Sequence, residues 1–259
     1  MIRRLKVTAM LLVLVPTAAS AASFSHAHWT AVLERFVDDR GRVDYAALAR
    51  DRTTLDRYLA SLERVSPDSS SALFATRADQ LAYWINAYNT AVIAGVLDRG
   101  VDTPSVWGDG FFGIGFFTVD RAKFGGRRMS LKSLEDDIVR ARFRDPRVHA
   151  ALNCASIGCP RLPRRAFEGA TLEADLDAAM REFVAEPRNC RIDLATRTLW
   201  LSKIFDWFED DFLSFQKEHG AAASSTVVDY VNRYRAKEAH IPPGLRVRFL
   251  EYDKRLNRQ

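Results

Sequence analysis

Long hydrophobic runs are scarce in this sequence of 259 residues. The apolar stretch Val7–Val15 is too short for a membrane-spanning helix, which needs about 20 residues. Charged residues such as Asp79, Asp98 and Arg99 interrupt the later apolar segments. We therefore expect no membrane span beyond the N-terminal leader.

A strong charge imbalance is also lacking. Three of the 38 basic residues lie in the first six positions, so residues 22–259 carry 35 basic residues against 33 acidic ones. The basic residues are scattered along the chain, whereas a nucleic-acid-binding face needs them clustered. The sequence also has no repeat, coiled-coil run or low-complexity linker. We therefore expect no nucleic-acid partner and a single globular domain over residues 22–259.

The first residues have the three parts of a secretory signal peptide. Arg3, Arg4 and Lys6 form the positive region. The apolar stretch Val7–Val15 follows, and the small residues Ala19–Ala21 offer a cleavage site. We predict that residues 1–21 are a cleaved signal peptide and that the protein is periplasmic or secreted. An uncleaved N-terminal anchor is the alternative.

Hydrophobic periodicity predicts helices interspersed with short strands. The predicted helices are His28–Val37, one that starts at Thr53 or Thr54, Arg77–Arg99, Ser133–Phe143, Leu172–Val184, Trp207–Lys217 and Thr226–Tyr234. The predicted strands are Phe116–Val119, Arg127–Met129, Arg147–Leu152, Cys190–Leu194, Thr198–Leu201 and Leu245–Leu250. Because strands and helices do not alternate regularly, we predict an α+β fold with helices packed around a small, mostly antiparallel sheet.

The predicted helix Arg77–Arg99 is apolar nearly all round, which is typical of a buried helix. It nevertheless carries Asn86 and Asn89, which are three residues apart and therefore share one face. Buried amides need hydrogen-bond partners. Two interpretations stay open: the asparagines line a polar pocket, or they tie the helix to the backbone of a nearby loop.

A second segment, His149–Pro160, brings a histidine and two cysteines together. The spacing of Cys154 and Cys159 excludes a Cys-x-x-Cys motif of the thioredoxin type. Cysteines of exported proteins usually form disulfides, so a Cys154–Cys159 bond that holds this loop is the leading hypothesis. If Cys154 instead stays free, its thiolate beside His149 is a nucleophile with His149 as its base.

Metal and cofactor sites are not predicted. His149, Cys154 and Cys159 are too few to hold a structural zinc ion, and Cys190 is the only other thiol. Gly108–Gly113 spells G-x-G-x-x-G, but no strand precedes it, so it is not interpreted as a dinucleotide site.

Three other polar features have simple structural interpretations. His26 and His28 lie two residues apart, which allows weak metal binding, but a frayed terminus is the favoured interpretation. The acidic triplets Glu135–Asp137 and Glu209–Asp211 are interpreted as solvated helix turns. Asp206 is explained by a helix cap, although its place after an apolar strand also allows it to face His149 as an orienting carboxylate.

Three motifs resemble the family called domain of unknown function 547 (DUF547). Tyr83–Asn89 resembles its F-W-I-N-x-Y-N signature, and His149–Pro160 resembles its H-x-A-L-x-C-x-x-x-x-C-P stretch. Leu201–Phe208 with Asp211 and Phe212 resembles its L-S-x-I-F-x-W-Y-x-x-D-F element. The resemblance covers about Arg77 to Phe212 and implies an exported bacterial member of a family without an assigned function.

The resemblance also bears on the site. Plant members of the family keep the histidine and replace the first cysteine. This implies that His149 and the asparagines form the shared site, and it argues against an obligatory cysteine nucleophile.

Three functions are consistent with these residues. The first is a hydrolase or acyl-transfer enzyme with His149 as general base, Asn86 or Asn89 stabilising charge or orienting the imidazole, and Cys154 as the nucleophile if it is free. The second is a non-catalytic envelope module whose pocket binds a small molecule or peptide. Its proposed rim is Trp107, Phe111, Phe112 and Phe116. The third is a structural or interaction protein of the envelope.

Overall fold

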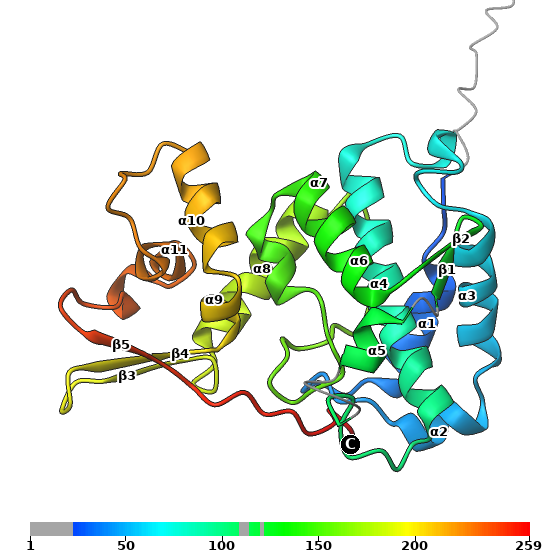
Figure 1. Ribbon diagram of the computed structural model, residues 1–259, viewed down its shortest axis with the longest axis horizontal. Coiled ribbons are helices and arrows are strands. Elements are labelled where there is room, and N and C mark those ends of the chain that lie inside the picture. The colour runs from blue at the N-terminus through cyan, green and yellow to red at the C-terminus, as the bar shows by residue number, and fades with distance from the viewer. Residues whose placement is uncertain (1–22, 109–113, 120–121) are drawn as a thin grey trace, which may run out of the picture.

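The computed structural model describes residues 23–108, 114–119 and 122–259, and its fold is α+β, as predicted (Figure 1). Its larger helices are α1 (Ala27–Phe36), α3 (Thr53–Arg64), α4 (Arg77–Arg99), α8 (Leu172–Ala185) and α10 (Glu209–Glu218). Shorter ones are α2 (Tyr45–Arg50), α5 (Ile114–Thr118), α6 (Leu131–Ser133), α7 (Ala141–Phe143), α9 (Ile204–Trp207) and α11 (Val227–Asn232). A π-helical segment, Leu134–Arg140, joins α6 to α7.

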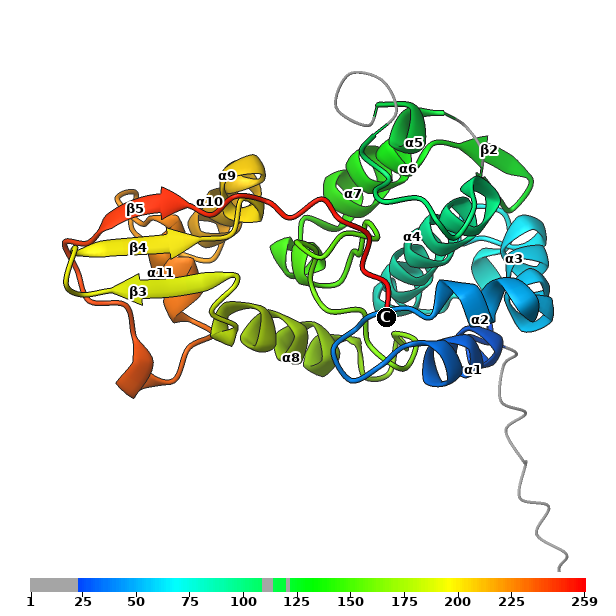
Figure 2. The same cartoon turned by 90° about the horizontal axis from the view of Figure 1, so that it is seen from below.

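The strands form two small sheets in the described part of the chain. Strands β1 (Ala122–Phe124) and β2 (Arg127–Met129) form an antiparallel hairpin. Strand β4 (Thr198–Leu201) pairs antiparallel with β3 (Cys190–Asp193) and parallel with β5 (Arg246–Phe249). The three-stranded sheet lies at the opposite end of the molecule from α1–α4 (Figure 2).

The buried apolar residues form two clusters, which we call the N-terminal lobe and the C-terminal lobe. The N-terminal lobe is built mainly from α1–α7, and the C-terminal lobe from β3–β5 and α9–α11. Helix α8 connects them, because Leu172 and Leu176 belong to the first cluster and Met180 and Phe183 to the second. After β5 the chain returns to the N-terminal lobe, where the Val43 N–H donates to the Asn257 carbonyl at 2.9 Å.

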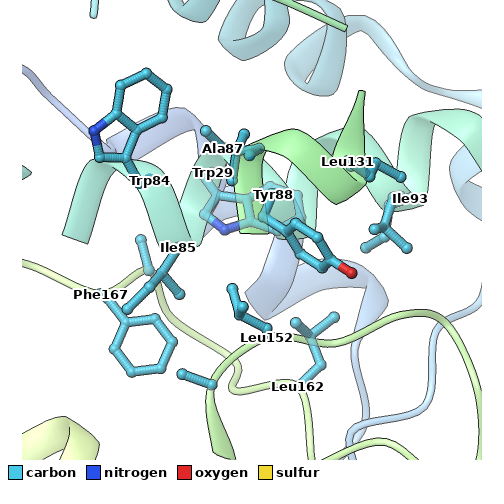
Figure 3. Packing of buried hydrophobic residues seen from close by; sticks show 14 of the residues in the cluster. Trp29, Trp84, Ile85, Ala87, Tyr88, Ile93, Leu131, Leu152, Leu162 and Phe167 are labelled. Carbon is cyan, nitrogen blue, oxygen red and sulfur yellow. The ribbon is translucent and has the colours of Figure 1, made fainter. Parts of the chain in front are cut away.

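Helix α4 is the central helix of the N-terminal lobe and has the predicted bounds. Thr76 and Asp79 form a reciprocal capping box at its start, and Gly100 ends it with a φ of 102°. Most of its side chains are buried, and Trp84, Ile85 and Tyr88 lie among residues of other segments such as Phe167 (Figure 3). This burial fixes the positions of the polar side chains in the middle of the helix, Asn86, Asn89 and Thr90.

The predicted strand Phe116–Val119 is wrong. Phe116 lies in α5 and is buried in the core of the N-terminal lobe. The strand that pairs with β2 is β1, immediately before the turn. Gly125 and Gly126 both have positive φ, 54° and 84°, and form a two-residue turn that pairs Phe124 with Arg127. So tight a turn requires the first strand to end at Phe124.

The predicted strand Arg147–Leu152 is also wrong. Residues Pro146–Ala150 form a 3₁₀ helix. Pro146 stands in the first turn of this helix, where its missing N–H costs nothing. The Asp145 carboxylate caps the helix by accepting from the Arg147 N–H. The helix predicted to start at Ser133 also begins at a different residue. Its N-cap is Ser130, whose side chain accepts from the Ser133 N–H, so the helix begins at Leu131.

The assignment of His26 to a frayed terminus is wrong, because its ring is buried and its Nδ1 lies 2.6 Å from the Tyr58 hydroxyl. Burial lowers the pKa of His26 from 6.5 to about 4. Between these values the unfolded chain binds a proton that the folded protein does not. The free energy of unfolding is therefore expected to fall as pH falls from 6.5 to 4, by about 3 kcal/mol at most.

Chemical denaturation at pH 7 and at pH 4 measures this effect. In H26Q the difference between the two pH values is expected to shrink, whereas the exposed control H240Q should keep the wild-type difference. An unchanged difference in H26Q would show that another group causes the acid sensitivity.

Candidate functional site

A cavity of about 430 Å³ lies where the two lobes meet. The N-terminal lobe contributes residues of α4, α5, α6, the π-helical segment and the His149–Pro160 loop. The C-terminal lobe contributes α9 and the segment after β5. The lining residues used below are Tyr88, Trp107, Lys132, Glu135, Asp136, Arg140, His149, Leu152, Cys154, Cys159, Ile204, Trp207, Phe208 and Tyr252.

His149 lies on the 3₁₀ helix and joins the two lobes. Its Nε2 is 2.7 Å from a carboxylate oxygen of Asp211 on α10. The ring stacks on Phe208 with 4.0 Å between the ring centroids, and the His149 side chain is only 2 % exposed. His149 is thus held by a carboxylate and by an aromatic face while it lines the cavity.

The charges of this pair are well defined. Burial lowers the pKa of His149, although Asp211 opposes the shift. Burial alone would raise the pKa of Asp211, but the hydrogen bonds of His149 and Arg140 outweigh it and hold that pKa well below its usual range. The pair therefore consists of a neutral imidazole and a carboxylate at neutral pH. Because the carboxylate accepts the Nε2 proton, the lone pair of the imidazole is on Nδ1.

A chain of ion pairs supports Asp211. Arg140 donates from Nε and Nη2 to the two Asp211 oxygens at 2.7 and 3.1 Å. Arg140 also donates from Nη1 to Asp136 at 2.6 Å, and Asp136 pairs with Lys132. The Arg140 guanidinium lies over the Phe208 ring, 4.8 Å from its centroid. These contacts fix the carboxylate that fixes His149.

The orienting carboxylate is Asp211 and not Asp206. Asp206 pairs with Lys203 at 2.5 Å on the surface of α9. The acidic triplets lie on helical turns, as expected, and Asp211, Glu135 and Asp136 are partly exposed. Asp211 and Asp136 are also paired with Arg140, and Glu135 and Asp136 line the cavity. The third family motif contains Asp211, so the sequence did hold a signal for this residue.

Glu135 is a second titratable group of the cavity that the sequence analysis did not select. Burial raises its pKa from 4.5 to about 7, even though a hydrogen bond from Tyr88 opposes the shift. Glu135 is therefore partly protonated near neutral pH, whereas His149 in the same cavity is neutral and basic. Two titratable groups in one site, one that carries a proton and one that is free to accept a proton, are typical of acid–base catalysis.

Cys154 and Cys159 form the disulfide that was the leading hypothesis. Cys190 is a free thiol that is buried elsewhere, and burial raises its pKa. The disulfide lines the cavity, and the Tyr252 hydroxyl lies 3.1 Å from each sulfur. In this oxidised form Cys154 has no thiolate, so it cannot act as a nucleophile.

Asn86 and Asn89 bind backbone groups and are not among the described residues that line the cavity. Asn86 is fully buried, donates to the Phe167 carbonyl at 2.8 Å and accepts from the Phe167 N–H at 3.0 Å. Asn89 donates to the Ala151 carbonyl at 2.9 Å and accepts from the Asn153 N–H at 2.8 Å. These bonds fit the interpretation that the asparagines tie α4 to nearby loops, and Asn89 holds the loop between His149 and Cys154.

Several sequence predictions concern residues outside the described part of the chain, among them the leader 1–21, Phe111, Phe112 and most of Gly108–Gly113. Of the other proposed rim residues, Trp107 lines the cavity and Phe116 packs in the core. Within the described residues, no group of three or more His, Cys, Asp and Glu side chains is placed to hold a metal ion. No described helix is long and apolar enough to cross a membrane.

Residues 73–184 match the family model described as protein of unknown function, DUF547. The match supports the family resemblance over α4 and the His149–Pro160 loop. The matched segment thus contains His149, Glu135 and both disulfide cysteines, whereas Asp211 lies beyond it. No curated protein and no solved structure matches the chain.

Proposed function

We propose that the protein is a hydrolase or acyl-transfer enzyme whose active site is the cavity between the lobes. The observation that carries this proposal is the 2.7 Å contact between His149 and Asp211 on the cavity wall. A carboxylate that holds one ring nitrogen of a neutral histidine leaves the other nitrogen as a general base. Glu135, with a pKa of about 7, supplies the matching acid.

The groups of the cavity define a hydrolytic step. His149 Nδ1 takes a proton from a water molecule, whose oxygen attacks the carbonyl carbon of the substrate. The protonated carboxyl of Glu135 then donates its proton to the leaving group as the carbon–leaving-group bond breaks. Water is the nucleophile of this step because Cys154 is held in the disulfide.

The cavity wall indicates the kind of substrate. Trp107, Leu152 and Ile204 line it with apolar surface, while the charged groups gather around Glu135 and Arg140. A volume of about 430 Å³ accommodates a small ligand. We therefore propose an ester or amide with a compact apolar acyl group.

Substitution of Asp211, which orients His149, tests the proposal. D211N is expected to lower kcat/KM for p-nitrophenyl butyrate by about a hundredfold, because an amide can present an N–H to His149 and favour the wrong tautomer. The matched control is D206N, which changes the carboxylate that pairs with Lys203 and should retain the wild-type rate. The proposal fails if wild type hydrolyses p-nitrophenyl acetate, butyrate and octanoate no faster than D211N does.

A non-catalytic binding module is the second candidate function, and one observation favours it. Trp107, Trp207 and Tyr252 contact one another at the cavity, with ring centroids 4.8 to 6.2 Å apart, and Trp207 is 43 % exposed. Such a group of aromatic rings binds apolar ligands without turnover. The ester assay separates the two functions, because a binding module shows no turnover that depends on Asp211.

We also propose that the protein is exported by the leader at residues 1–21. The positive, apolar and small-residue regions of this segment support export. The Cys154–Cys159 disulfide is a second support, since disulfides persist in oxidising compartments outside the cytoplasm.

A further inference from the structure

The two sulfurs of the Cys154–Cys159 bond have different surroundings. Cys159 is buried, with only 2 % of its surface exposed, whereas Cys154 is partly exposed. Both line the cavity that His149 also lines. A disulfide that only clamped a loop would not need to face a cavity large enough for a ligand.

One hydrogen bond distinguishes the buried sulfur from its partner. The Cys154 N–H donates to Cys159 Sγ at 3.0 Å, whereas the Tyr252 hydroxyl lies 3.1 Å from both sulfurs and stands beside whichever of them leaves. Burial raises the pKa of Tyr252, so its hydroxyl keeps its proton and remains a donor. Hydrogen bonds to a thiolate stabilise its charge and make that sulfur the better leaving group.

We propose that Cys154–Cys159 is an exchangeable disulfide, at which a thiol that enters the cavity attacks Cys154 and displaces Cys159. The incoming thiolate forms a bond to Cys154 Sγ while the bond between Cys154 and Cys159 breaks. The electron pair of the broken bond goes to Cys159 Sγ, which leaves as a thiolate beside the Cys154 N–H and the Tyr252 hydroxyl.

The chemical class of the reactant follows from this step. A monothiol remains as a mixed disulfide on Cys154. A dithiol completes the reduction. Its second thiolate attacks the dithiol sulfur that is bonded to Cys154, and Cys154 is released as a thiolate. Two electrons then pass from the dithiol to the cysteine pair, and the dithiol leaves as a disulfide. This exchange does not depend on the proposed hydrolysis and is measured without any ester.

Glutathione is the probe for the attacked sulfur. Oxidised C190A protein is exposed to reduced glutathione, and free thiols are trapped within seconds by N-ethylmaleimide. Fragment masses of the peptide with both cysteines are expected to show glutathione on Cys154 and maleimide on Cys159. Glutathione on Cys159, or no adduct under these conditions, would overturn the proposal.

The leaving sulfur is tested by its acidity. In reduced C190A protein, the thiolate absorbance near 240 nm is expected to reveal one thiol with a pKa below about 8.5, the ordinary value for cysteine. Y252F should raise this pKa and slow adduct formation about fivefold or more. The matched control is Y88F, because Tyr88 lines the same cavity but bonds Glu135. A pKa at or above the ordinary value, or equal effects of Y252F and Y88F, would contradict the stabilisation of the leaving thiolate by the Tyr252 hydroxyl.

Discussion

Replacing His149 with Gln is expected to lower kcat/KM for p-nitrophenyl butyrate by about a thousandfold. Gln fills much of the volume of the imidazole, and its amide can still donate to Asp211. It has no basic nitrogen, however, so the water molecule loses its proton acceptor. The effect should exceed that of D211N, since Asp211 acts through His149 and does not take the proton itself.

The control for this substitution is the exposed His240 of the C-terminal lobe. H240Q should retain the wild-type rate, and thermal unfolding of H149Q should stay within a few degrees of wild type. A folded H149Q protein that hydrolyses the ester within threefold of the wild-type rate would exclude His149 as the base. Loss of folding in H149Q would instead assign His149 to the core.

Replacing Asn86 with Ala is expected to lower the free energy of unfolding by about 3 kcal/mol. Both hydrogen-bonding groups of the amide pair with the backbone of Phe167, and the side chain is fully buried. The substitution leaves the Phe167 N–H and carbonyl without a partner inside the protein. Each unpaired buried group costs about 1–3 kcal/mol. Urea denaturation at pH 7 measures the change.

Gln80 offers a matched control on the same helix. Its side chain has one long hydrogen bond, 3.5 Å to the Phe74 carbonyl, and lies nearer the surface. Q80A should therefore change the free energy of unfolding by less than about 1 kcal/mol. If N86A costs no more than Q80A, Asn86 does not tie α4 to the Phe167 loop, and a role at the site becomes the better explanation.

The parts of the fold that the sequence predicted best are those with strong local signals. Helix α4 is apolar nearly all round, has a capping box at Thr76 and a glycine at its end, and its predicted bounds agree with the structure. Strands β3 and β4 likewise follow from a short alternating pattern interrupted by a turn. In both places local propensity and tertiary packing favour the same structure.

The wrong predictions fall where tertiary contacts or turn geometry decide. Phe116 has a strand-like neighbourhood but packs into the core from a helix. The segment around His149 is apolar enough for a strand, yet Pro146 and the Asp145 cap turn it into a 3₁₀ helix. Short apolar segments of this kind fit both structures, and the periodicity alone does not separate them.

The candidate site was predictable in part. His149 and the disulfide follow from one contiguous segment, where their spacing is visible. Asp211 is 62 positions away from His149, and only the packing of α10 against the 3₁₀ helix brings the two together. Glu135 resembled a surface residue in an acidic triplet, and its raised pKa results from burial that no local pattern reveals.

The pH dependence of kcat/KM for ethyl butyrate, whose alkoxide leaving group needs a proton, tests the central claim, that His149 and Glu135 are the base and acid of one site. The rate should rise with pH as His149 loses its proton below 6.5, and fall again near pH 7 as Glu135 loses its proton. In E135Q the falling limb should disappear and the maximum should drop by about a hundredfold. A wild-type rate that rises steadily with hydroxide concentration, or an unchanged bell-shaped profile in E135Q, would contradict the account.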